Sequence, residues 1–333
     1  MVVKDPFRAL LIEQNDGQVH HSIRELSPDA LPPGDVLVSV AYSSLNYKDG
    51  LAVTGQGKVV HRYPMVPGID LAGTVAESGA PAFKPGDQVL ATGWGLGESH
   101  WGGYAQVARV PGEWLLPLPN GLTLRQAMGI GTAGLTAMLS VMVLEEHGLR
   151  PNQQEVIVTG AAGGVGSVAV AILAKLGYDV AASTGRPETY DYLKALGAWQ
   201  IIDRKRFSDS SERSLESEQW AGAIDSVGGN TLGTLLRTMT HGGTVAACGL
   251  AGGSRLATTV FPFILRGVAL IGIASSTTPT ERRRNAWVRL VHDLPREQLE
   301  RMIQVAPLTE APSLSRAILT GQVRGRVVID PNQ

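Results

Sequence analysis

Short apolar runs alternate with turn residues along the first third of the chain. Runs rich in β-branched residues lie at 8–13, 34–46, 73–78 and 87–93, and turns such as "LPPGD" and "FKPGD" separate them. Apolar runs bounded in this way by proline and glycine are typical of β-strands. We therefore expect a compact, barrel-like β domain at the start of the chain.

The spacing of the apolar positions changes after Leu124. The stretch 124–148 has helical spacing and ends at a glycine. Strand-like and helix-like stretches then alternate, which argues for a parallel sheet with helices on both faces. The expected strands are 155–160, 179–184, 199–204, 220–228, 243–250 and 268–275, and the expected helices are 164–177 and 188–197.

The rest of the chain completes the expected α/β architecture. The polar segment 208–219 predicts a surface loop or a frayed helix, and 281–294 predicts a helix. The stretch 316–330 ends in a strand pattern that can rejoin the first domain. We expect a β-rich domain over 1–126 that is completed by 277–333, and a doubly wound parallel-sheet domain over 127–276.

Composition and charge narrow the class of protein. Charged residues make up 18% and hydrophobic residues 44% of 333 residues, and the net charge of −1 argues against nucleic-acid and membrane surfaces as partners. The first seventeen residues carry early charges and no long apolar stretch, so neither a signal peptide nor a membrane span is expected there. The expected location is cytoplasmic.

A glycine-rich turn follows the strand expected at 155–160. Gly160, Gly163, Gly164 and Gly166 stand between that strand and an apolar helix. Glycines let the backbone approach a diphosphate, and the helix N-terminus supplies N–H donors. A tight turn without a ligand is the alternative, but the complete strand–turn–helix–strand setting favours a nucleotide.

The same stretch also matches the pattern of another dehydrogenase family, but the position of the match in the chain indicates that it is accidental. Residues Thr159 to Gly166 spell the turn of the short-chain dehydrogenases, and Tyr190 and Lys194 follow with that family's catalytic spacing. In that family the turn opens the chain and the tyrosine lies much further downstream. Tyr190 is therefore interpreted as a packing residue.

The end of the next expected strand indicates which dinucleotide binds. Enzymes that prefer NAD usually place an acid there for the ribose 2′-hydroxyl. This chain has Ser183, Thr184, Gly185 and Arg186 instead, and the first acid is Glu188. Because arginine forms charge-assisted forks with phosphate, the pattern favours the 2′-phosphate of NADPH over a surface arginine beside a turn.

Several motifs occur in an order that resembles the medium-chain dehydrogenase/reductase superfamily. They are "GDVLVSVAYSSLNYKD", "PMVPGIDLAGTV", "KPGDQV", "WGGYAQ", "GTAGLTA" and the glycine turn, and they cover essentially the whole chain. The resemblance implies a GroES-like catalytic domain followed by a Rossmann domain. "SSLNYKDGLAVTGQGKVV", "GWGLGESHWGG", "VAACGLAGG" and "FPFILRGV" resemble the acrylyl-CoA reductase subgroup, whose members are often labelled quinone oxidoreductases.

The chain departs from the zinc alcohol dehydrogenases of the same superfamily. Those enzymes place a metal-binding cysteine near Asn46 and Tyr47, and a His–Glu pair at Ile69 and Asp70. Cys248 is the single cysteine, so neither the catalytic zinc site nor the four-cysteine structural lobe can be built. We expect a metal-free enzyme.

The resemblance implies NADPH-dependent reduction of the C=C bond of a short 2-enoyl-CoA, acrylyl-CoA to propanoyl-CoA. A conjugated thioester accepts hydride at the β-carbon without a Lewis acid, and the protein must hold the resulting enolate and supply a proton. Tyr47 can donate that proton or a hydrogen bond, or pack on the nicotinamide ribose. Asn46 is a candidate carbonyl donor, and Asp49 either orients its neighbours or caps the following turn.

Further residues are carried over from the resemblance by motif. Thr132 is a weaker candidate near the domain junction, His100 is expected to make a structural hydrogen bond, and Cys248 is expected to be an inert buried thiol. The expected cofactor contacts are Tyr47, Ala162, Gly163, Gly164, Val165, Gly166, Ser183, Thr184, Gly185, Arg186, Arg204, Leu250, Ile264 and Ser275.

Other functions remain open at this stage. A reductase of quinones or enals is the rival within the same class, and an NADPH-binding sensor or structural protein is the rival outside it. Arg282, Arg283 and Arg284, with Arg324 and Arg326, either contact CoA phosphates or belong to a solvated helix face and a strand edge. A homodimer joined through 268–275 is expected from the family alone.

Overall fold

The computed structural model describes residues 6–151, 155–208 and 213–333. Contacts divide the chain into a first unit, Met1–Thr132 with Met302–Gln333, and a second unit, Ala133–Arg301. These boundaries differ slightly from the predicted domains at 127–132, which belong to the first unit. The larger difference is at 277–301, which pack in the second unit. Helix α7 (Thr280–Asp293) explains the difference, because Arg289 pairs with Glu145 and Arg282 pairs with Glu146 on a helix of that unit.

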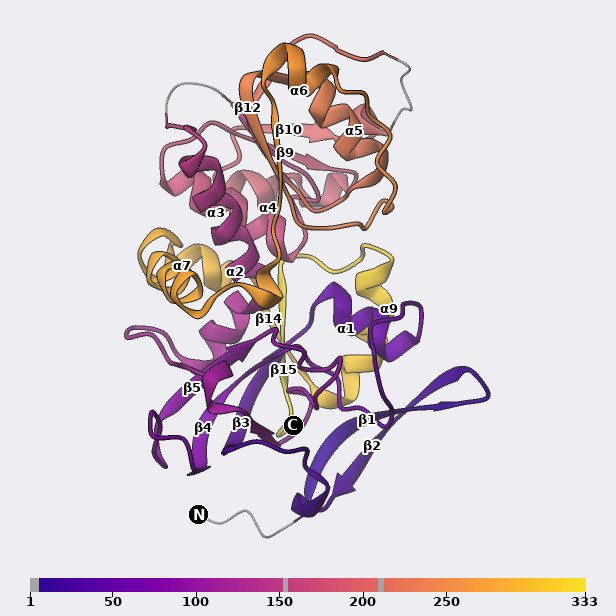
Figure 1. The fold of residues 1–333 in the computed structure, drawn as a ribbon, viewed down its shortest axis with the longest axis vertical. Helices are drawn as coiled ribbons and strands as arrows, with labels where there is room; N and C mark the ends of the chain where they lie inside the picture. The colour runs from indigo at the N-terminus through magenta and orange to yellow at the C-terminus, as the bar shows by residue number, and fades with distance from the viewer. Residues whose placement is uncertain (1–5, 152–154, 209–212) are drawn as a thin grey trace. The chain divides into compact units, whose positions relative to one another are not determined.

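The first unit is built on a mostly antiparallel sheet, coloured indigo, purple and yellow in Figure 1. Its strand order is β14 (Ile303–Pro307), β15 (Arg326–Asp330), β3 (Val36–Ser44), β4 (Asp70–Ser78), β5 (Gln88–Thr92) and β7 (Leu116–Pro117), with β6 (Val107–Val110) also on β3. A separate hairpin joins β1 (Phe7–Asn15) to β2 (Gln18–Leu26). The predicted strands and the return of the C-terminal strand to this unit are confirmed.

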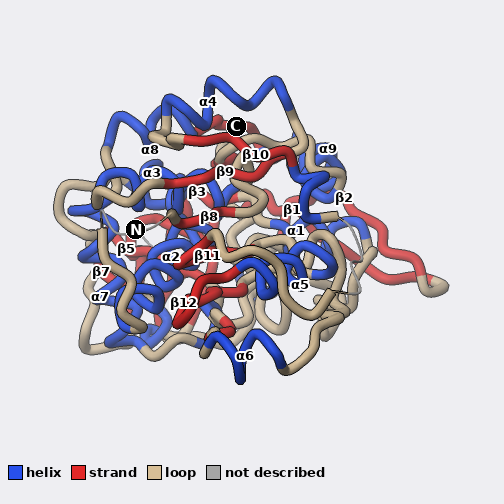
Figure 2. Tube along the Cα trace, turned by 90° about the horizontal axis from the view of Figure 1, so that it is seen from above, coloured by secondary structure: helices blue, strands red, loops and turns tan. Residues whose placement is uncertain are grey.

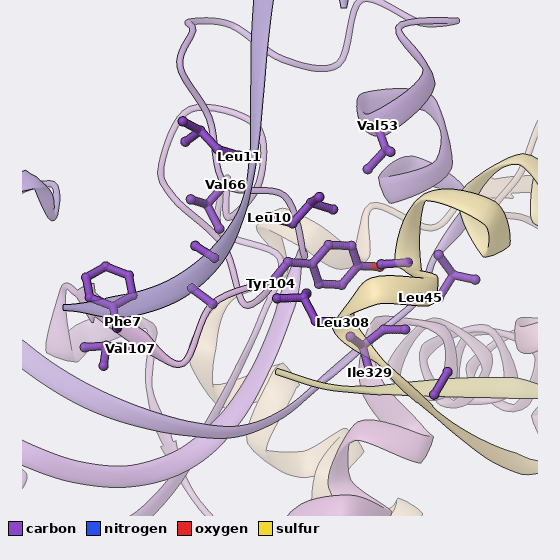
Figure 3. Close-up of a cluster of buried hydrophobic side chains, with 14 of the residues drawn as sticks. Phe7, Leu10, Leu11, Leu45, Val53, Val66, Tyr104, Val107, Leu308 and Ile329 are labelled. Carbon is purple, nitrogen blue, oxygen red and sulfur yellow. The ribbon is translucent and has the colours of Figure 1, made fainter. Parts of the chain in front are cut away.

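A buried apolar cluster fixes helix α1 (Tyr47–Thr54) in the first unit. Tyr104 lies at its centre, and Leu10, Leu45, Val53, Leu308 and Ile329 surround it (Figure 3). The helix also packs closely on α9 (Ala311–Leu319), since a Cβ on Gly50 would lie 2.9 Å from the Ser315 carbonyl oxygen. Both contacts hold the first residues of α1 at the end of β3.

The second unit contains the expected parallel sheet. Its order is β10 (Gln200–Asp203), β9 (Val180–Thr184), β8 (Val156–Val158), β11 (Trp220–Asp225), β12 (Met239–Ala247) and β13 (Ala269–Gly272). Figure 2 shows this row of strands with α3 (Gly164–Lys175) on one side and α5 (Gly229–Thr238) on the other. Strand order reverses between β8 and β11, so the doubly wound prediction is confirmed.

The remaining helices were predicted with less success. Helices α4 (Tyr190–Ala195) and α7 match expected ones, whereas α1, α5, α6 (Phe261–Arg266), α8 (Arg296–Met302) and α9 were not expected. In the segment 208–219, residues 209–212 lie outside the described residues, and the described part forms no helix.

Helix α2 (Leu124–Glu146) was expected to be continuous, but its backbone leaves the helical region at Gly131, with φ 52° and ψ −159°. By length and composition α2 could cross a membrane, yet 89% of its apolar window is buried inside the protein. A buried helix with that composition is typical of a protein core.

Candidate active site and cofactor-binding residues

Helix α1 begins with residues that the sequence singled out. The Asp49 carboxylate accepts the backbone N–H of Asn46 at 2.9 Å, as in a capping box, so the capping interpretation of Asp49 is supported. Its other oxygen accepts the backbone N–H groups of Gly68 at 3.1 Å and Ile69 at 2.9 Å. Asp49 therefore ties the start of α1 to the start of β4.

The Asn46 amide is turned into the protein rather than left for a substrate. Its Nδ2 donates to the Asp70 carboxylate at 2.9 Å and lies 3.3 Å from Asp49 Oδ2. The side chain is 7% exposed. With its donors on two carboxylates, Asn46 holds α1 in place, and its predicted contact with a substrate carbonyl is not available in this arrangement.

Asp70 is the centre of this network, and sequence analysis considered it only as the counterpart of a metal ligand. Besides Asn46 it accepts Ser44 Oγ at 2.5 Å, Thr132 N at 2.8 Å and Thr132 Oγ1 at 2.5 Å. A Cβ on Gly131 would lie 2.6 Å from Asp70 Oδ2, so the break in α2 lets the chain approach. Thr132 therefore belongs to this network.

Arg326 supplies the positive charge beside the two carboxylates. Its side chain is buried, and it donates to the carbonyl oxygens of Gly129 at 2.8 Å and Leu45 at 3.3 Å and to Asn46 Oδ1 at 3.4 Å. For Arg326 the sequence left two interpretations open, a phosphate contact and a strand edge. The structure corrects the first, because the buried guanidinium is held within the first unit.

Burial gives Asp49 an unusual proton affinity. Burial, and after it the Asp70 carboxylate, raise the pKa of Asp49 from 3.8 to about 7, while the N–H groups of Ile69 and Asn46 oppose the rise. Desolvation disfavours the charged carboxylate and a like charge adds to that effect. Asp49 can therefore change its charge near neutral pH.

Tyr47 has the exposure that a ligand contact needs. It is the first residue of α1 and is half-buried. Within the described parts of the chain its hydroxyl has no hydrogen-bond partner. The hydroxyl is therefore available to a bound molecule, whether as a donor or as a cofactor contact.

The residues at this place do not fit a zinc ion. Zinc sites use cysteine, histidine or carboxylate ligands with free lone pairs. Here Asn46 and Ile69 stand at two ligand positions, and Asp70 accepts four hydrogen bonds. Among the residues that the structure describes, no group of three or more His, Cys, Asp or Glu side chains could hold a metal ion.

His100 and Cys248 have structural environments. His100 Nε2 lies 2.7 Å from the Arg109 carbonyl oxygen and its ring packs edge-on against Trp114. Burial raises the pKa of the Cys248 thiol from 9.0 to about 12, with a further contribution from Asp225, so the thiol stays protonated at neutral pH. The prediction for His100 agrees with the structure, whereas Cys248 is half-buried rather than buried as expected.

The glycine turn lies at the point where strand order reverses in the second unit. Gly160 has φ 58°, and a Cβ on it would lie 2.4 Å from Ser226 Oγ. Helix α3 starts at Gly164, so the N–H groups of Gly164, Val165 and Gly166 have no partner within the helix. In doubly wound sheets this place binds a nucleotide diphosphate.

Asp225 and Thr159 stabilise the turn, and sequence analysis missed both roles. Thr159 Oγ1 donates to the Asp225 carboxylate at 2.5 Å, and the backbone N–H groups of Val227 and Gly228 also donate to it. Burial raises the pKa of Asp225, and these donors oppose the rise. The pattern strand–Asp–Ser is too short a signal to indicate this bond from sequence.

The residues after β9 form a second part of the candidate cofactor site. Arg186 Nη2 donates to the Ala162 carbonyl oxygen at 3.4 Å, which places the guanidinium beside the glycine turn. A Cβ on Gly185 would lie 2.3 Å from Arg204 Nε and 2.5 Å from its Cδ, so the Arg204 side chain lies directly on Gly185. The strand pairing explains this contact, because Asp203 is level with Thr184.

The two hydroxyl residues of this segment are less accessible than expected. Ser183 and Thr184 are both buried. Thr184 Oγ1 lies 3.2 Å from Thr189 Oγ1 and accepts the N–H of Arg186 at 3.2 Å. Thr184 therefore shapes the turn that presents Arg186, which is half-buried, while Arg204 is exposed.

Three more predicted cofactor contacts lie elsewhere in the second unit. A Cβ on Gly228 would lie 3.3 Å from the Leu250 Cα, so Leu250 is close to the reversal point, and it is 56% exposed. Ile264 on α6 is 67% exposed. Ser275 accepts a hydrogen bond from Thr136 Oγ1 at 2.7 Å.

The arginine run of α7 is used within the second unit. Arg282 forms a two-pronged ion pair with Glu146, at 2.9 Å for each bond. Arg283 is 1% exposed and donates to the carbonyl oxygens of Ser275 at 3.1 Å and Ser276 at 3.2 Å. Only Arg284 of this run is fully exposed, so of the two interpretations left open the contact with CoA phosphates is not supported for Arg282 and Arg283. Arg324 in the first unit is exposed.

Comparison with known proteins agrees with these two halves. Residues 32–120 match the alcohol dehydrogenase GroES-like domain, and residues 164–292 match the zinc-binding dehydrogenase domain. The acrylyl-CoA reductase AcuI of Ruegeria pomeroyi is 55% identical over 328 residues, which are 98% of this chain and 99% of that protein. The quinone-oxidoreductase-like protein YhfP of Bacillus subtilis is 48% identical over 97% of this chain and 98% of its own.

Solved structures give the same result. The YhdH oxidoreductase of Salmonella enterica, in complex with NADP, has 55% identity and a TM-score of 0.95, over 97% of this chain and 99% of that chain. YhfP with NAD bound has 47% identity and a TM-score of 0.94, over 98% of this chain and 99% of its own. The chain therefore belongs to the medium-chain dehydrogenase/reductase family, in the group that contains the acrylyl-CoA reductase AcuI.

Proposed function

We propose that this protein reduces the C=C bond of a short 2-enoyl-CoA, acrylyl-CoA to propanoyl-CoA, with NADPH as the hydride donor. The observation that carries the proposal is 55% identity to an acrylyl-CoA reductase along 98% of this chain. The candidate residues support it, because they include a nucleotide-binding turn in one unit and an available tyrosine hydroxyl in the other.

The choice of NADPH rests on the end of β9. No acid stands there for a ribose 2′-hydroxyl; the Arg204 side chain lies on Gly185, and Arg186 is the next residue. Two guanidinium groups suit a 2′-phosphate, which NADH lacks. Two relatives at 55% identity have been solved with NADP or NADPH and one at 47% identity with NAD, and the arginines are the feature of this chain that favours NADPH.

The reaction needs a hydride, an anion stabiliser and a proton. NADPH supplies the hydride, which adds two electrons and one hydrogen to the β-carbon and leaves an enolate on the thioester. The glycine turn and the first N–H groups of α3 would hold the diphosphate and so orient the donor. The Tyr47 hydroxyl would donate to the enolate oxygen or position the cofactor ribose, and the α-carbon then takes its proton from that hydroxyl or from water.

No metal is needed in this scheme, since the thioester already withdraws electrons from the C=C bond. We therefore propose a zinc-independent enzyme, with Asn46, Asp49 and Asp70 positioning α1 rather than binding an ion. A cytoplasmic homodimer joined along β13, with no nucleic-acid or membrane partner, completes the proposal. Strand β13 is the edge of its sheet, and an edge leaves backbone groups open to a second copy.

Reduction of quinones is the second candidate, favoured by the 48% identity to YhfP. A substrate panel separates the two. Purified protein would be assayed for NADPH oxidation with acrylyl-CoA, crotonyl-CoA and a benzoquinone. We expect the highest kcat/KM with acrylyl-CoA. A benzoquinone that exceeds both thioesters would favour the second candidate, and binding of NADPH with no turnover would favour a sensor.

A further inference from the structure

The proposed function requires a place for phosphate groups that the site described above does not supply. An acyl-CoA carries a 3′-phospho-ADP group at the far end of its pantetheine arm from the reacting thioester. Three of the five arginines that the sequence suggested for it are engaged elsewhere: Arg282 in an ion pair, Arg283 and Arg326 in buried hydrogen bonds. Arg284 and Arg324 are exposed but belong to different units, so the candidates are cations that lie together in one segment.

Residues 58–63 of the first unit, between α1 and β4, carry such cations. Lys58 and Arg62 are exposed, and within the described parts of the chain neither side chain forms an ion pair or a hydrogen bond. No acid occurs between Asp49 and Asp70. The segment therefore carries two positive charges that no acid of the segment neutralises.

The acids next to this segment are already paired. Glu98 accepts Lys48 Nζ at 2.8 Å, and Glu13 accepts Arg24 Nη2 at 2.5 Å. Arg62 contributes, after burial, to lowering the pKa of His100. Because these two acids are paired with Lys48 and Arg24, they do not neutralise Lys58 or Arg62.

Backbone bonds hold the segment in place. The N–H of His61 donates to the Glu98 carbonyl oxygen at 2.8 Å, and Met65 and Ile12 exchange two backbone hydrogen bonds at 2.8 and 2.9 Å. Because Glu98 also pairs with Lys48, the residue after Tyr47, the segment is connected to the start of α1 through one residue. A pre-formed anion site loses less entropy on binding than a loose loop.

Partly exposed aromatic rings accompany the cations. Tyr63 and Trp101 pack on the small core of Ile12, Ala52 and Met65, and both remain half-exposed. The Trp101 indole N–H donates to the Pro64 carbonyl oxygen at 3.2 Å, which fixes the ring against the segment. Cations beside aromatic faces are the combination that holds a phosphorylated nucleotide, because the base stacks while the charges bind the phosphates.

We infer that residues 58–63, with Trp101, bind the 3′-phospho-ADP group of the acyl-CoA substrate, with Lys58 and Arg62 on its phosphates. This inference rests on the proposed function. It assigns the segment to recognition of the CoA carrier, distinct from the NADPH-binding residues of the second unit and from the reacting groups around Tyr47.

Binding of free coenzyme A tests the inference without relying on catalysis. Coenzyme A would be titrated calorimetrically into the NADP⁺-loaded full-length protein and into Lys58→Glu and Arg62→Glu. We expect each reversal to weaken binding by about tenfold or more, since it removes one charge-assisted contact and adds repulsion. Lys84→Glu is the matched control, because Lys84 is an exposed lysine of the same unit in the turn before β5; it should bind coenzyme A as the wild type does.

Kinetics provides the second readout. For Arg62→Glu we expect the KM for acrylyl-CoA to rise by a similar factor while kcat and the KM for NADPH stay unchanged. The acrylyl thioester of N-acetylcysteamine lacks the nucleotide, so its kcat/KM should not respond. Wild-type coenzyme A affinity in both reversal variants would overturn the site and leave the reductase standing. Coenzyme A binding that depends on Arg62, with no thioester turnover, would overturn the reductase and keep the site.

Discussion

At the scale of single residues, Gly185 determines how the Arg204 side chain lies. An alanine there would place a Cβ 2.3 Å from Arg204 Nε, so the guanidinium would have to move. We expect Gly185→Ala and Arg204→Ala each to raise the Kd for NADPH by about tenfold, the loss expected from one charge-assisted bond, and to leave the Kd for NADH nearly unchanged. Nicotinamide fluorescence on titration measures both.

The double variant makes this prediction specific. If Gly185 acts only through Arg204, the double variant should bind NADPH no more weakly than Arg204→Ala alone. Arg186→Ala should also weaken NADPH selectively. Losses of equal size with NADH and NADPH would contradict the assignment of the arginines to the 2′-phosphate.

Tyr47 has two candidate roles that one substitution separates. Tyr47→Phe keeps the ring and removes the hydroxyl. If the hydroxyl gives the proton or holds the enolate oxygen, kcat should fall by roughly 10²–10⁴-fold with little change in NADPH affinity. If it only positions the cofactor, the Kd for NADPH should rise instead. A variant with wild-type kcat and wild-type Kd for NADPH would exclude both roles.

Residue roles could be predicted from sequence only where a local motif states them. The glycine turn and the arginine after β9 are readable because each role follows from a few consecutive residues. The hydrogen bonds of the Asn46 amide could not be predicted from the sequence, because its partners Asp70 and Arg326 are 24 and 280 residues away in the chain. The position of Asn46 at the end of a strand suggested a substrate contact, and only the structure shows that its amide is bound to buried partners.

At the scale of elements, the start of α1 carries a pH-dependent contribution to stability. The pKa of Asp49 is raised to about 7 in the folded protein, from 3.8. The folded state therefore keeps a proton that the unfolded state loses, so this contribution is complete below pH 4 and is lost as the pH rises to 7. The slope is at most about 1.4 kcal/mol per pH unit.

Asp49→Asn tests that sign. The variant cannot titrate at this position. As the pH rises from 4 to 7, the free energy of unfolding of the wild type should therefore fall relative to that of the variant. Denaturant titrations at several pH values measure it, and the variant's own loss of hydrogen bonds cancels in the slope. A difference that is constant with pH would mean that Asp49 is ionised throughout.

Elements were predictable where their period is long enough to show. Strand β8, helix α3 and strand β9 form a regular apolar series, and they were placed correctly. Helix α1 was missed because its eight residues directly follow a strand, and its capping pair was the only local signal. The break in α2 was missed because a single glycine such as Gly131 is compatible with a helical pattern. The close approach of the chain to Asp70, which requires the break, is visible only in the structure.

At the scale of the whole molecule, the account predicts activity without a metal. The purified active protein should contain no stoichiometric zinc by elemental analysis, since the residues at the family's ligand positions are Asn46, Ile69 and a fully hydrogen-bonded Asp70. EDTA should leave kcat unchanged. Reversible inactivation by the chelator, with recovery on adding zinc, would contradict the proposed chemistry.

The fate of the transferred hydrogen tests the central claim most directly. Acrylyl-CoA would be reduced in ordinary water with NADPH deuterated at the transferred position of C4, and the propanoyl-CoA examined by NMR and mass spectrometry. The account predicts one deuterium at the β-carbon and a hydrogen from water at the α-carbon. With unlabelled NADPH in D₂O, it predicts deuterium at the α-carbon and hydrogen at the β-carbon. Deuterium at the α-carbon, or no propanoyl-CoA while a benzoquinone is reduced, would contradict it.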